Sequence, residues 1–320
     1  MMFNVVSKFK CKTTQLVLKI KNRERTIHRG KQNPDKIFYV IGIPYKMAGL
    51  FAIVNSTLSH IIYAIGKNYI PIVDLANYPS QYLDLNIKFT DNAWEYFFQQ
   101  PAYYTLKDIV KSKNIILSKK EQTPNVENAI SVLFTQDEYI DKLKEISSYF
   151  RKYIRFNDDT FRVLNEKYEK LIHSDDIVLG VLCRGTDYLK KKPKYHPIQP
   201  DPRCVLDKVI SLSQELNFTK VYLATEDHDI YDIFLEALGD KLITNGQYLY
   251  RDVSNVQYLS EIVNSRSNDK YLRGIEYLTS IYILSKCTYF IGGMTAGSLG
   301  VLLMNSEFEY KYIWNLGTYK

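Results

Sequence analysis

Residues 177–182 form an unbroken apolar run, Ile-Val-Leu-Gly-Val-Leu, with polar, turn-forming residues on either side. Such a run predicts a strand buried on both faces, which is typical of a parallel sheet covered by helices. One residue later the chain places four residues that suit a ligand site: Arg184, Gly185, Thr186 and Asp187. Open α/β sheets bind ligands at the carboxyl ends of their strands, and an Arg fork suits a pair of phosphate oxygens. We therefore expect a binding turn here, with a surface ion pair between Arg184 and Asp187 as the alternative.

The first half of the chain has a strand–helix–strand pattern. An apolar and aromatic run at 37–41 is followed by apolar residues at helical spacing over 47–67 and by a second apolar run at 69–74. This pattern predicts the start of a Rossmann-like domain. Its connection at 42–49 carries Lys46, which we expect to face the space between two domains.

The second half alternates strands and helices in the same way. Strands are expected at 221–224, 241–244, 289–291 and 311–314, and helices at 201–216, 229–238 and 275–287. A helical stretch at 137–171, broken at 157–160, connects the halves. We therefore predict an α/β fold with two Rossmann-like domains, at 37–172 and 173–320, preceded by a basic arm at 1–36.

A second turn built from glycine and hydroxyl residues, Gly-Gly-Met-Thr-Ala-Gly-Ser, occupies 292–298. Small residues let a backbone approach a diphosphate, and hydroxyl and helix-start N–H groups donate to it. Thr295, Gly297 and Ser298 are therefore candidate phosphate ligands, with a tight strand–helix corner as the alternative. The turn has neither the P-loop nor the dinucleotide-binding glycine pattern, which argues against a dehydrogenase.

Glu226 and Asp227 follow the strand expected at 221–224. A carboxylate at this place hydrogen-bonds ribose hydroxyls in nucleotide-binding folds. The alternative is an N-cap for the helix at 229–238, a role that Asp227 also suits. The same acidic cluster could chelate a metal, but Arg184 already supplies a fixed cation, so we expect no metal.

Two further stretches bear on ligand binding. Residues 92–101 are rich in aromatic side chains, which hold sugar rings in many binding sites. A hydrophobic corner beneath a loop is the alternative that we favour. Residues 247–271 are polar and irregular, which predicts a mobile or binding loop.

The central motif resembles that of a known family. The sequence Val-Leu-Gly-Val-Leu-Cys-Arg-Gly-Thr-Asp-Tyr at 178–188, followed by His-Pro-Ile at 196–198, is similar to the nucleotide-sugar-binding motif of the α1,6-fucosyltransferases. That group includes rhizobial nodulation enzymes and animal core fucosyltransferases, with the protein O-fucosyltransferases as distant relatives. Residues 221–227 resemble its second motif, and Leu-Arg-Gly at 272–274 together with 283–298 resembles its third.

The resemblance spans 175–305 and implies a GT-B-like fold with the donor in the C-terminal domain. It implies inverting, metal-independent transfer of fucose from GDP-fucose to a glycan hydroxyl, with no cofactor. It also implies that Arg184 neutralises the departing β-phosphate and that His196 bonds a base or phosphate, or braces its loop. The family's guanine-reading acid aligns with Ser280, and Glu276 lies one turn away.

No general base carries over from the family, because Lys192 stands where the family has its acceptor-side Glu. Asp187 is our candidate base, and a carboxylate of the N-terminal domain is the alternative. A transferase of another GDP- or UDP-sugar would share the features above. A non-catalytic nucleotide-sugar or glycan binder would account for the missing base. We expect the acceptor to be a surface polysaccharide or a lipid-linked oligosaccharide.

The net charge of +7 is concentrated at the N-terminus. Residues 1–36 contain seven Lys and three Arg against Glu24 and Asp35, and the remainder is slightly acidic. A basic arm binds anionic lipid at about 1 kcal/mol per charge. We expect an anionic membrane surface rather than nucleic acid as its partner, with a solvated terminus as the alternative. Alternating apolar residues at 15–21 predict an edge strand in this arm.

The sequence also bears on the cellular compartment. No stretch approaches the roughly 20 apolar residues of a membrane helix, and the first residues lack the pattern of a secretory signal. The four cysteines have no CxxC spacing, which suits a reducing compartment. We therefore expect a cytoplasmic protein that associates peripherally with the inner face of a membrane.

Overall fold

The computed structural model describes residues 23–87, 89–118, 140–192, 194–251, 259–262 and 264–320. The first 22 residues of the expected basic arm, including the edge strand expected at 15–21, lie outside these ranges.

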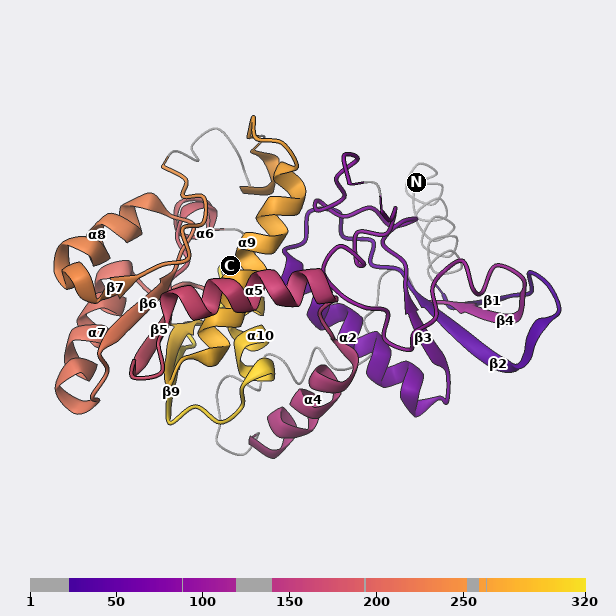
Figure 1. The fold of residues 1–320 in the computed structure, drawn as a ribbon, viewed down its shortest axis with the longest axis horizontal. Helices are drawn as coiled ribbons and strands as arrows, with labels where there is room; N and C mark the ends of the chain where they lie inside the picture. The colour runs from indigo at the N-terminus through magenta and orange to yellow at the C-terminus, as the bar shows by residue number, and fades with distance from the viewer. Residues whose placement is uncertain (1–22, 88, 119–139, 193, 252–258, 263) are drawn as a thin grey trace, which may run out of the picture.

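Within the described residues the strands form two sheets, one in each half of the chain (Figure 1). The strands are β1 (Arg25–Ile27), β2 (Gln32–Ile41), β3 (Ile70–Val73), β4 (Ser112–Leu117), β5 (Val178–Leu182), β6 (Lys220–Ala224), β7 (Leu242–Ile243), β8 (Tyr289–Gly293) and β9 (Tyr310–Trp314). The helices are α2 (Leu50–Gly66), α4 (Ile140–Tyr153), α5 (Asp158–Leu171), α6 (Thr186–Lys191), α7 (Pro202–Glu215), α8 (His228–Leu238), η2 (Gly239–Lys241), η3 (Leu259–Glu261), α9 (Asp269–Lys286) and α10 (Ala296–Met304).

The N-terminal sheet has the strand order β1-β4-β2-β3. The elements β2, α2 and β3 form the predicted βαβ unit, and β2 pairs with β3 in parallel. Sequence patterns did not predict β4, which is parallel to β2 and antiparallel to β1. β1 and the beginning of β2 fall within the expected arm at 1–36. This part of the expected arm therefore pairs in the N-terminal sheet.

The C-terminal sheet is parallel throughout, with the order β7-β6-β5-β8-β9. Every residue of β5 is buried, as its apolar run predicts, because helices cover both of its faces. Leu179 and Val181 pack with side chains of α7 and α8, whereas Val178 and Leu182 pack with side chains of α9 and α10. The carboxyl ends of β5, β6 and β8 therefore lie together at one edge of the sheet.

Helices α2, α4 and α10 lie between the two sheets and join the halves of the chain (Figure 1). Phe51 of α2 packs directly on Gly300 of α10, where an added Cβ would lie 2.1 Å from the Phe51 ring. The Asn55 amide donates to the Ala296 carbonyl at 3.1 Å, and Ser147 Oγ of α4 donates to the Leu303 carbonyl at 2.7 Å. Apolar packing and these hydrogen bonds hold the two halves together.

The helical connector is broken where the sequence predicts. The Asn157 side chain accepts a hydrogen bond from Thr160 N at 2.8 Å and so caps α5. The neighbouring aromatic stretch at 92–101 is a hydrophobic corner rather than a sugar platform. Its large aromatic side chains are buried in the core: Trp94, Tyr96, Phe97 and Phe98.

No helix in the described ranges combines the length and the apolar character that crossing a bilayer requires.

His60 is a buried histidine in the N-terminal half. It lies on α2 with its side chain 3% exposed, and Nδ1 is 3.1 Å from the Tyr39 hydroxyl. Burial disfavours the charged imidazolium and lowers the pKa of His60 from 6.5 to about 4. The folded protein therefore keeps this ring neutral at pH values where the unfolded chain protonates it.

We predict that His60 destabilises the protein as the pH falls from 6.5 toward 4. In this window the unfolded state takes up a proton that the native state refuses, so the free energy of unfolding falls by up to about 3 kcal/mol. The difference in unfolding free energy between wild type and His60→Gln, measured in urea across this window, isolates the effect from other titrating groups. A difference that does not change with pH would contradict the prediction.

Candidate functional site

A cavity of about 730 Å³ opens between the two halves, at the carboxyl ends of β5, β6 and β8. The N-terminal half contributes the segment before α2, including Lys46 as expected, and the first turns of α2. The C-terminal half contributes residues from several segments: Arg184, His196, Glu226, Gln247, Tyr248, Tyr250, Leu259, Arg273, Glu276, Tyr277, Thr295, Ala296 and Gly297. We call this cavity the cleft.

Arg184 and Glu226 lie side by side in the cleft. The parallel register aligns Leu182 at the end of β5 with Ala224 at the end of β6, so the residues that follow come together. Arg184 Nε is 3.7 Å from Glu226 Oε1, and about a quarter or less of each side chain is exposed. The low exposure strengthens the electrostatic effect of both charges on anything bound beside them.

Gly185 and Asp227, the residues that follow Arg184 and Glu226, pack closely against each other. The Asp227 side chain caps α8, accepting from Asp229 N at 2.9 Å and from Ile230 N at 3.4 Å. An added Cβ on Gly185 would lie 2.4 Å from Asp227 Oδ2, so only glycine permits this approach. Asp227 is 5% exposed and does not line the cleft. Of the two acids expected to contact ribose, Asp227 therefore takes the alternative role of helix cap, and Glu226 alone faces the cleft.

The candidate phosphate ligands in the turn before α10 have two different roles, since some line the cleft and one braces the turn. Thr295 is the N-cap of α10, and its hydroxyl accepts from Ser298 N at 3.0 Å. Ser298 is fully buried, and its hydroxyl donates to the Gly293 carbonyl at 2.5 Å. Thr295 and Gly297 line the cleft, whereas Ser298 braces the corner. The Ser298 hydroxyl is thus engaged inside the corner, and the expected role of Ser298 as a phosphate ligand stays a prediction.

Helix α2 begins on the opposite wall. Its N-cap is Gly49, which has no side chain to cap the helix, and Leu50 N donates to the Tyr82 hydroxyl at 2.9 Å. Phe51 and Ala52 of the first turn line the cleft. The N-termini of α2 and α10 thus open on the same space, and neither first turn carries an acidic residue. Helix N-termini carry partial positive charge and exposed N–H donors, so the cleft favours an anion.

The remaining residues of the central motif have different positions. His196 lines the cleft. Thr186 and Asp187 begin α6, but the placement of their side chains lies outside the described part of the chain. Their expected roles stay predictions.

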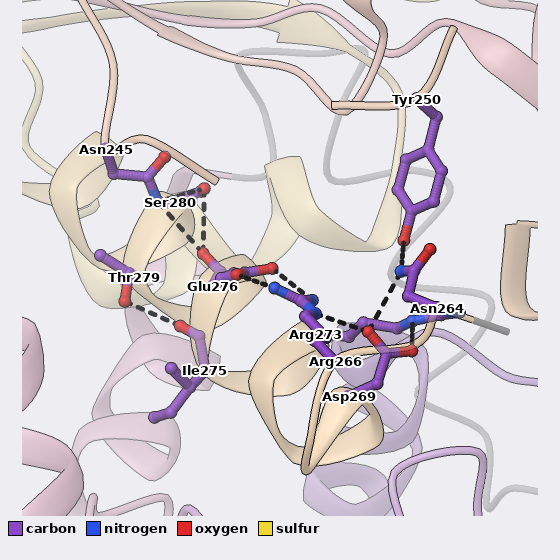
Figure 2. Close-up of polar contacts among 10 residues, drawn as sticks. All are labelled: Asn245, Tyr250, Asn264, Arg266, Asp269, Arg273, Ile275, Glu276, Thr279 and Ser280. Carbon is purple, nitrogen blue, oxygen red and sulfur yellow. Dashed lines mark hydrogen bonds and ion pairs between the residues drawn. The ribbon is translucent and has the colours of Figure 1, made fainter. Parts of the chain in front are cut away.

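Figure 2 shows a network of charged and polar residues around Arg273 and Glu276, which line the cleft. We call this part of the cleft its outer wall. Arg266 binds the Glu276 carboxylate with both terminal nitrogens, at 2.5 and 3.0 Å, and its Nε is 2.6 Å from Asp269 Oδ1. The same guanidinium lies 5.4 Å from the centre of the Tyr248 ring. Burial acts to raise the pKa of Asp269, but hydrogen bonds from Arg266 and Asn264 outweigh it and hold that pKa below its usual range. Glu276 lines the cleft with both of its side-chain oxygens held by Arg266.

Arg273 fixes the neighbouring loop. Its Nε is 2.7 Å from Asp269 Oδ2, and its terminal nitrogens donate to the carbonyls of Leu259 and Ile262. Burial raises the pKa of Tyr82 to about 12, against the hydrogen bond from Leu50 N and the charges of Arg184 and Arg273. Both guanidinium groups therefore act on the same part of the cleft.

Sequence reasoning missed the roles of Arg266, Arg273 and Tyr248. Arg273 was noted only as part of a motif, and residues 247–271 only as an irregular loop. The four-residue spacing of Asp269 and Arg273 was the available signal, since residues four apart are neighbours on a helix, whereas Arg266 precedes the N-cap of α9. Among the described residues, no three His, Cys, Asp or Glu side chains gather closely enough to hold a metal ion.

Comparisons with known proteins bear on the fold. No protein-family model matches the chain, and no curated protein matches it. The structure of POFUT1 in complex with GDP is similar over 86% of this chain and 98% of that chain, with 11% identity and a TM-score of 0.51. NodZ alpha-1,6-fucosyltransferase soaked with GDP-fucose matches 84% of this chain and 93% of its own, with 16% identity and a TM-score of 0.46. Fucosyltransferase NodZ from Bradyrhizobium covers 84% and 94%, with 16% identity and a TM-score of 0.48. The protein has the fold of POFUT1, which confirms the GT-B-like class expected from the sequence.

We predict that Asp227→Ala lowers the free energy of unfolding by about 1–2 kcal/mol, because α8 loses its N-cap. Asp227→Asn keeps an acceptor oxygen and costs less. Denaturant unfolding of the two variants and wild type measures the difference. Equal unfolding midpoints for all three proteins would exclude the capping role.

Proposed function

We propose that the protein is a glycosyltransferase that moves a sugar from a nucleoside-diphosphate donor to a glycan hydroxyl with inversion, and that the donor is GDP-fucose. One observation carries the proposal: Arg184 and the N-termini of α2 and α10 face one cleft between two α/β halves. The bound GDP in POFUT1 and the GDP-fucose soaked into NodZ are in keeping with it.

The diphosphate is the part of the donor for which the cleft is best suited. Arg184 offers a planar fork to the β-phosphate and neutralises the charge that develops as the sugar departs. Thr295, Gly297 and the first N–H groups of α10 lie across the cleft and suit the remaining phosphate oxygens. This arrangement supplies fixed positive charge from the chain itself, so the proposed reaction uses no metal and no cofactor.

The nucleoside is assigned to the wall formed by β6 and α9. Glu226 suits the ribose hydroxyls, and Glu276 suits the N1 and N2 donors of guanine. Each Glu276 oxygen accepts one hydrogen bond from Arg266 and keeps a lone pair for the base. Tyr248, with Arg266 near its ring, offers an aromatic face beside this carboxylate. His196 lines the same cleft and suits a hydrogen bond to the base or to a phosphate.

A general base must take the proton from the acceptor hydroxyl. Glu226 and Glu276, the acids lining the cleft among the described residues, are both ion-paired with arginine. Asp187 at the start of α6 remains our candidate for taking the acceptor proton. The paired state of both acids also favours a second candidate function, a nucleotide-sugar or glycan binder without turnover. A transferase of another nucleotide-sugar remains the alternative donor assignment.

The acceptor is proposed to enter from the N-terminal half, beside Lys46. A surface polysaccharide or lipid-linked oligosaccharide is the proposed acceptor, and we retain an anionic membrane surface as the proposed partner of the basic residues in 1–36. The expected cytoplasmic location and peripheral membrane association belong to the same proposal.

Calorimetric binding of GDP, UDP and ADP, followed by hydrolysis of the matching sugar nucleotides in excess EDTA, tests the donor. We expect GDP to bind most tightly and GDP-fucose to be hydrolysed without a metal. Tighter binding of UDP or ADP would reassign the donor, and binding without turnover on any acceptor would favour the binding-protein alternative. Absence of binding to all three nucleotides would overturn the proposal.

Arg184→Lys is expected to remain folded and to lose about 100-fold or more in kcat, because an ammonium cannot replace the bidentate fork at the departing phosphate. Arg162→Lys is the matched control, since Arg162 is an exposed arginine on α5. Kinetics of donor turnover and thermal unfolding of both variants provide the comparison. Near-normal kcat and KM in Arg184→Lys would remove the phosphate role.

A further inference from the structure

The loop that carries His196 is held by a distant part of the chain. Tyr195 N donates to the Tyr319 carbonyl at 2.8 Å, and Tyr319 N donates to the His196 carbonyl at 3.0 Å. Ile198 N donates to the Gly317 carbonyl at 2.9 Å. Between these bonds, residues 197 and 318 form an antiparallel bridge. The backbone on both sides of His196 is therefore tied to residues 317–319.

Residues 315–319, which we call the strap, are themselves fixed to the sheet. They follow β9, whose last residue, Trp314, pairs with Gly293 and accepts a hydrogen bond from Met294 N at 3.1 Å. Gly317 then turns the chain with a φ of +80°, a left-handed conformation that glycine adopts without strain. Gly317 N donates to Asn315 Oδ1 at 3.3 Å and closes the turn.

A second contact joins the same loop to the turn before α10. Gln199 is 4% exposed, and its amide donates to the Pro197 carbonyl and to the Met294 carbonyl, each at 3.2 Å. Met294 directly precedes Thr295, which lines the cleft. The strap and Gln199 thus hold the His196 loop and the Thr295 turn in one arrangement.

We propose that the strap is a positioning element of the donor site, which fixes the backbone of His196 so that its side chain meets the nucleotide in the cleft. The proposal rests on the proposed function, because it assigns the strap to the same nucleotide. His196 lies outside any helix or named strand, between Tyr195 at a φ of +66° and a proline. A loop without its own ladder of hydrogen bonds depends on outside partners for a single conformation. The strap supplies these partners through main-chain groups, which a comparison of side chains alone would not detect.

Tyr319→Pro and Tyr319→Ala form the matched pair that tests the strap. Proline removes the N–H that donates to the His196 carbonyl, whereas alanine keeps it and removes only the side chain. We expect Tyr319→Pro to raise the Kd for GDP about threefold to tenfold, the effect of about one backbone hydrogen bond. We expect Tyr319→Ala to bind GDP as wild type does, with thermal unfolding midpoints that agree among the three proteins.

Measuring Tyr319→Pro and Tyr319→Ala again in a His196→Ala background separates an effect that acts through His196 from a general loss of order in the loop. If the strap acts through His196, the difference between the proline and alanine variants disappears when the imidazole is absent. An undiminished difference in that background would overturn the assignment to His196. Equal GDP affinity of the proline and alanine variants in the wild-type background would overturn the proposal altogether.

Amide hydrogen exchange makes the test independent of the nucleotide. We expect the amides of Tyr195 and Ile198 to exchange faster in Tyr319→Pro than in Tyr319→Ala. Equal exchange would show that the strap does not hold the loop and would overturn the inference even where GDP binds. Absence of GDP binding by wild type, together with faster exchange in the proline variant, would instead refute the proposed donor.

Discussion

The contact between α2 and α10 is the constraint on which the cleft depends. Phe51 packs against Gly300, and Asn55 bonds the first residue of α10, so the helices meet within a turn or two of their N-termini. Because each helix begins at the carboxyl end of a strand in its own half, joining them there turns both N-termini toward one space. A side chain at position 300 would push the helices apart. The anion-binding character of the cleft thus follows from an apolar contact.

The parallel register of the C-terminal sheet supplies the charged partners. Neighbouring parallel strands end at the same edge, so residues that follow β5, β6 and β8 converge although up to about a hundred residues separate them in sequence. Arg184 follows β5 and Glu226 follows the neighbouring strand β6, so the two lie close together. Thr295 follows β8, the neighbour of β5 on its other side. The ion pair with Glu226 orients the Arg184 side chain in a part of the site that is largely shielded from water.

The sequence was sufficient for the elements whose signal is local. The apolar run of β5, the helical spacing of α2 and the proline-led start of α7 each predict one element without reference to the rest. β4 could not be found in this way, since a short run gains its stability from pairing with β1 and β2, distant in sequence. Local sequence patterns also do not show which of two nearby candidate residues faces the cleft. Glu226 faces the cleft, whereas Asp227 turns to cap α8, because successive residues at a strand end point in different directions. Thr295 lines the cleft, whereas the Ser298 hydroxyl bonds the Gly293 carbonyl inside the corner. The bonds from Arg266 to Glu276 and from the strap to the His196 loop depend on tertiary contacts that no spacing rule encodes.

The two sides of the cleft are held by different kinds of force, and the difference bears on what each can do. The floor, formed where α2 meets α10, is fixed by close apolar packing, which salt scarcely affects and which tolerates little change in geometry. The outer wall is held by the ion pairs of Arg266 and Arg273 with Asp269 and Glu276, whose strength depends on charge and which salt screens less than it screens fully exposed pairs. Rigid geometry suits the common diphosphate of nucleotide-sugars, whose charge must be met at fixed positions. A wall built from polar side chains can change its hydrogen-bonding partners by single substitutions, which suits the choice of base. Under the proposed function, the contacts to phosphate and the contacts to the nucleobase would therefore lie in separate parts of the cleft, so that one could change without disturbing the other.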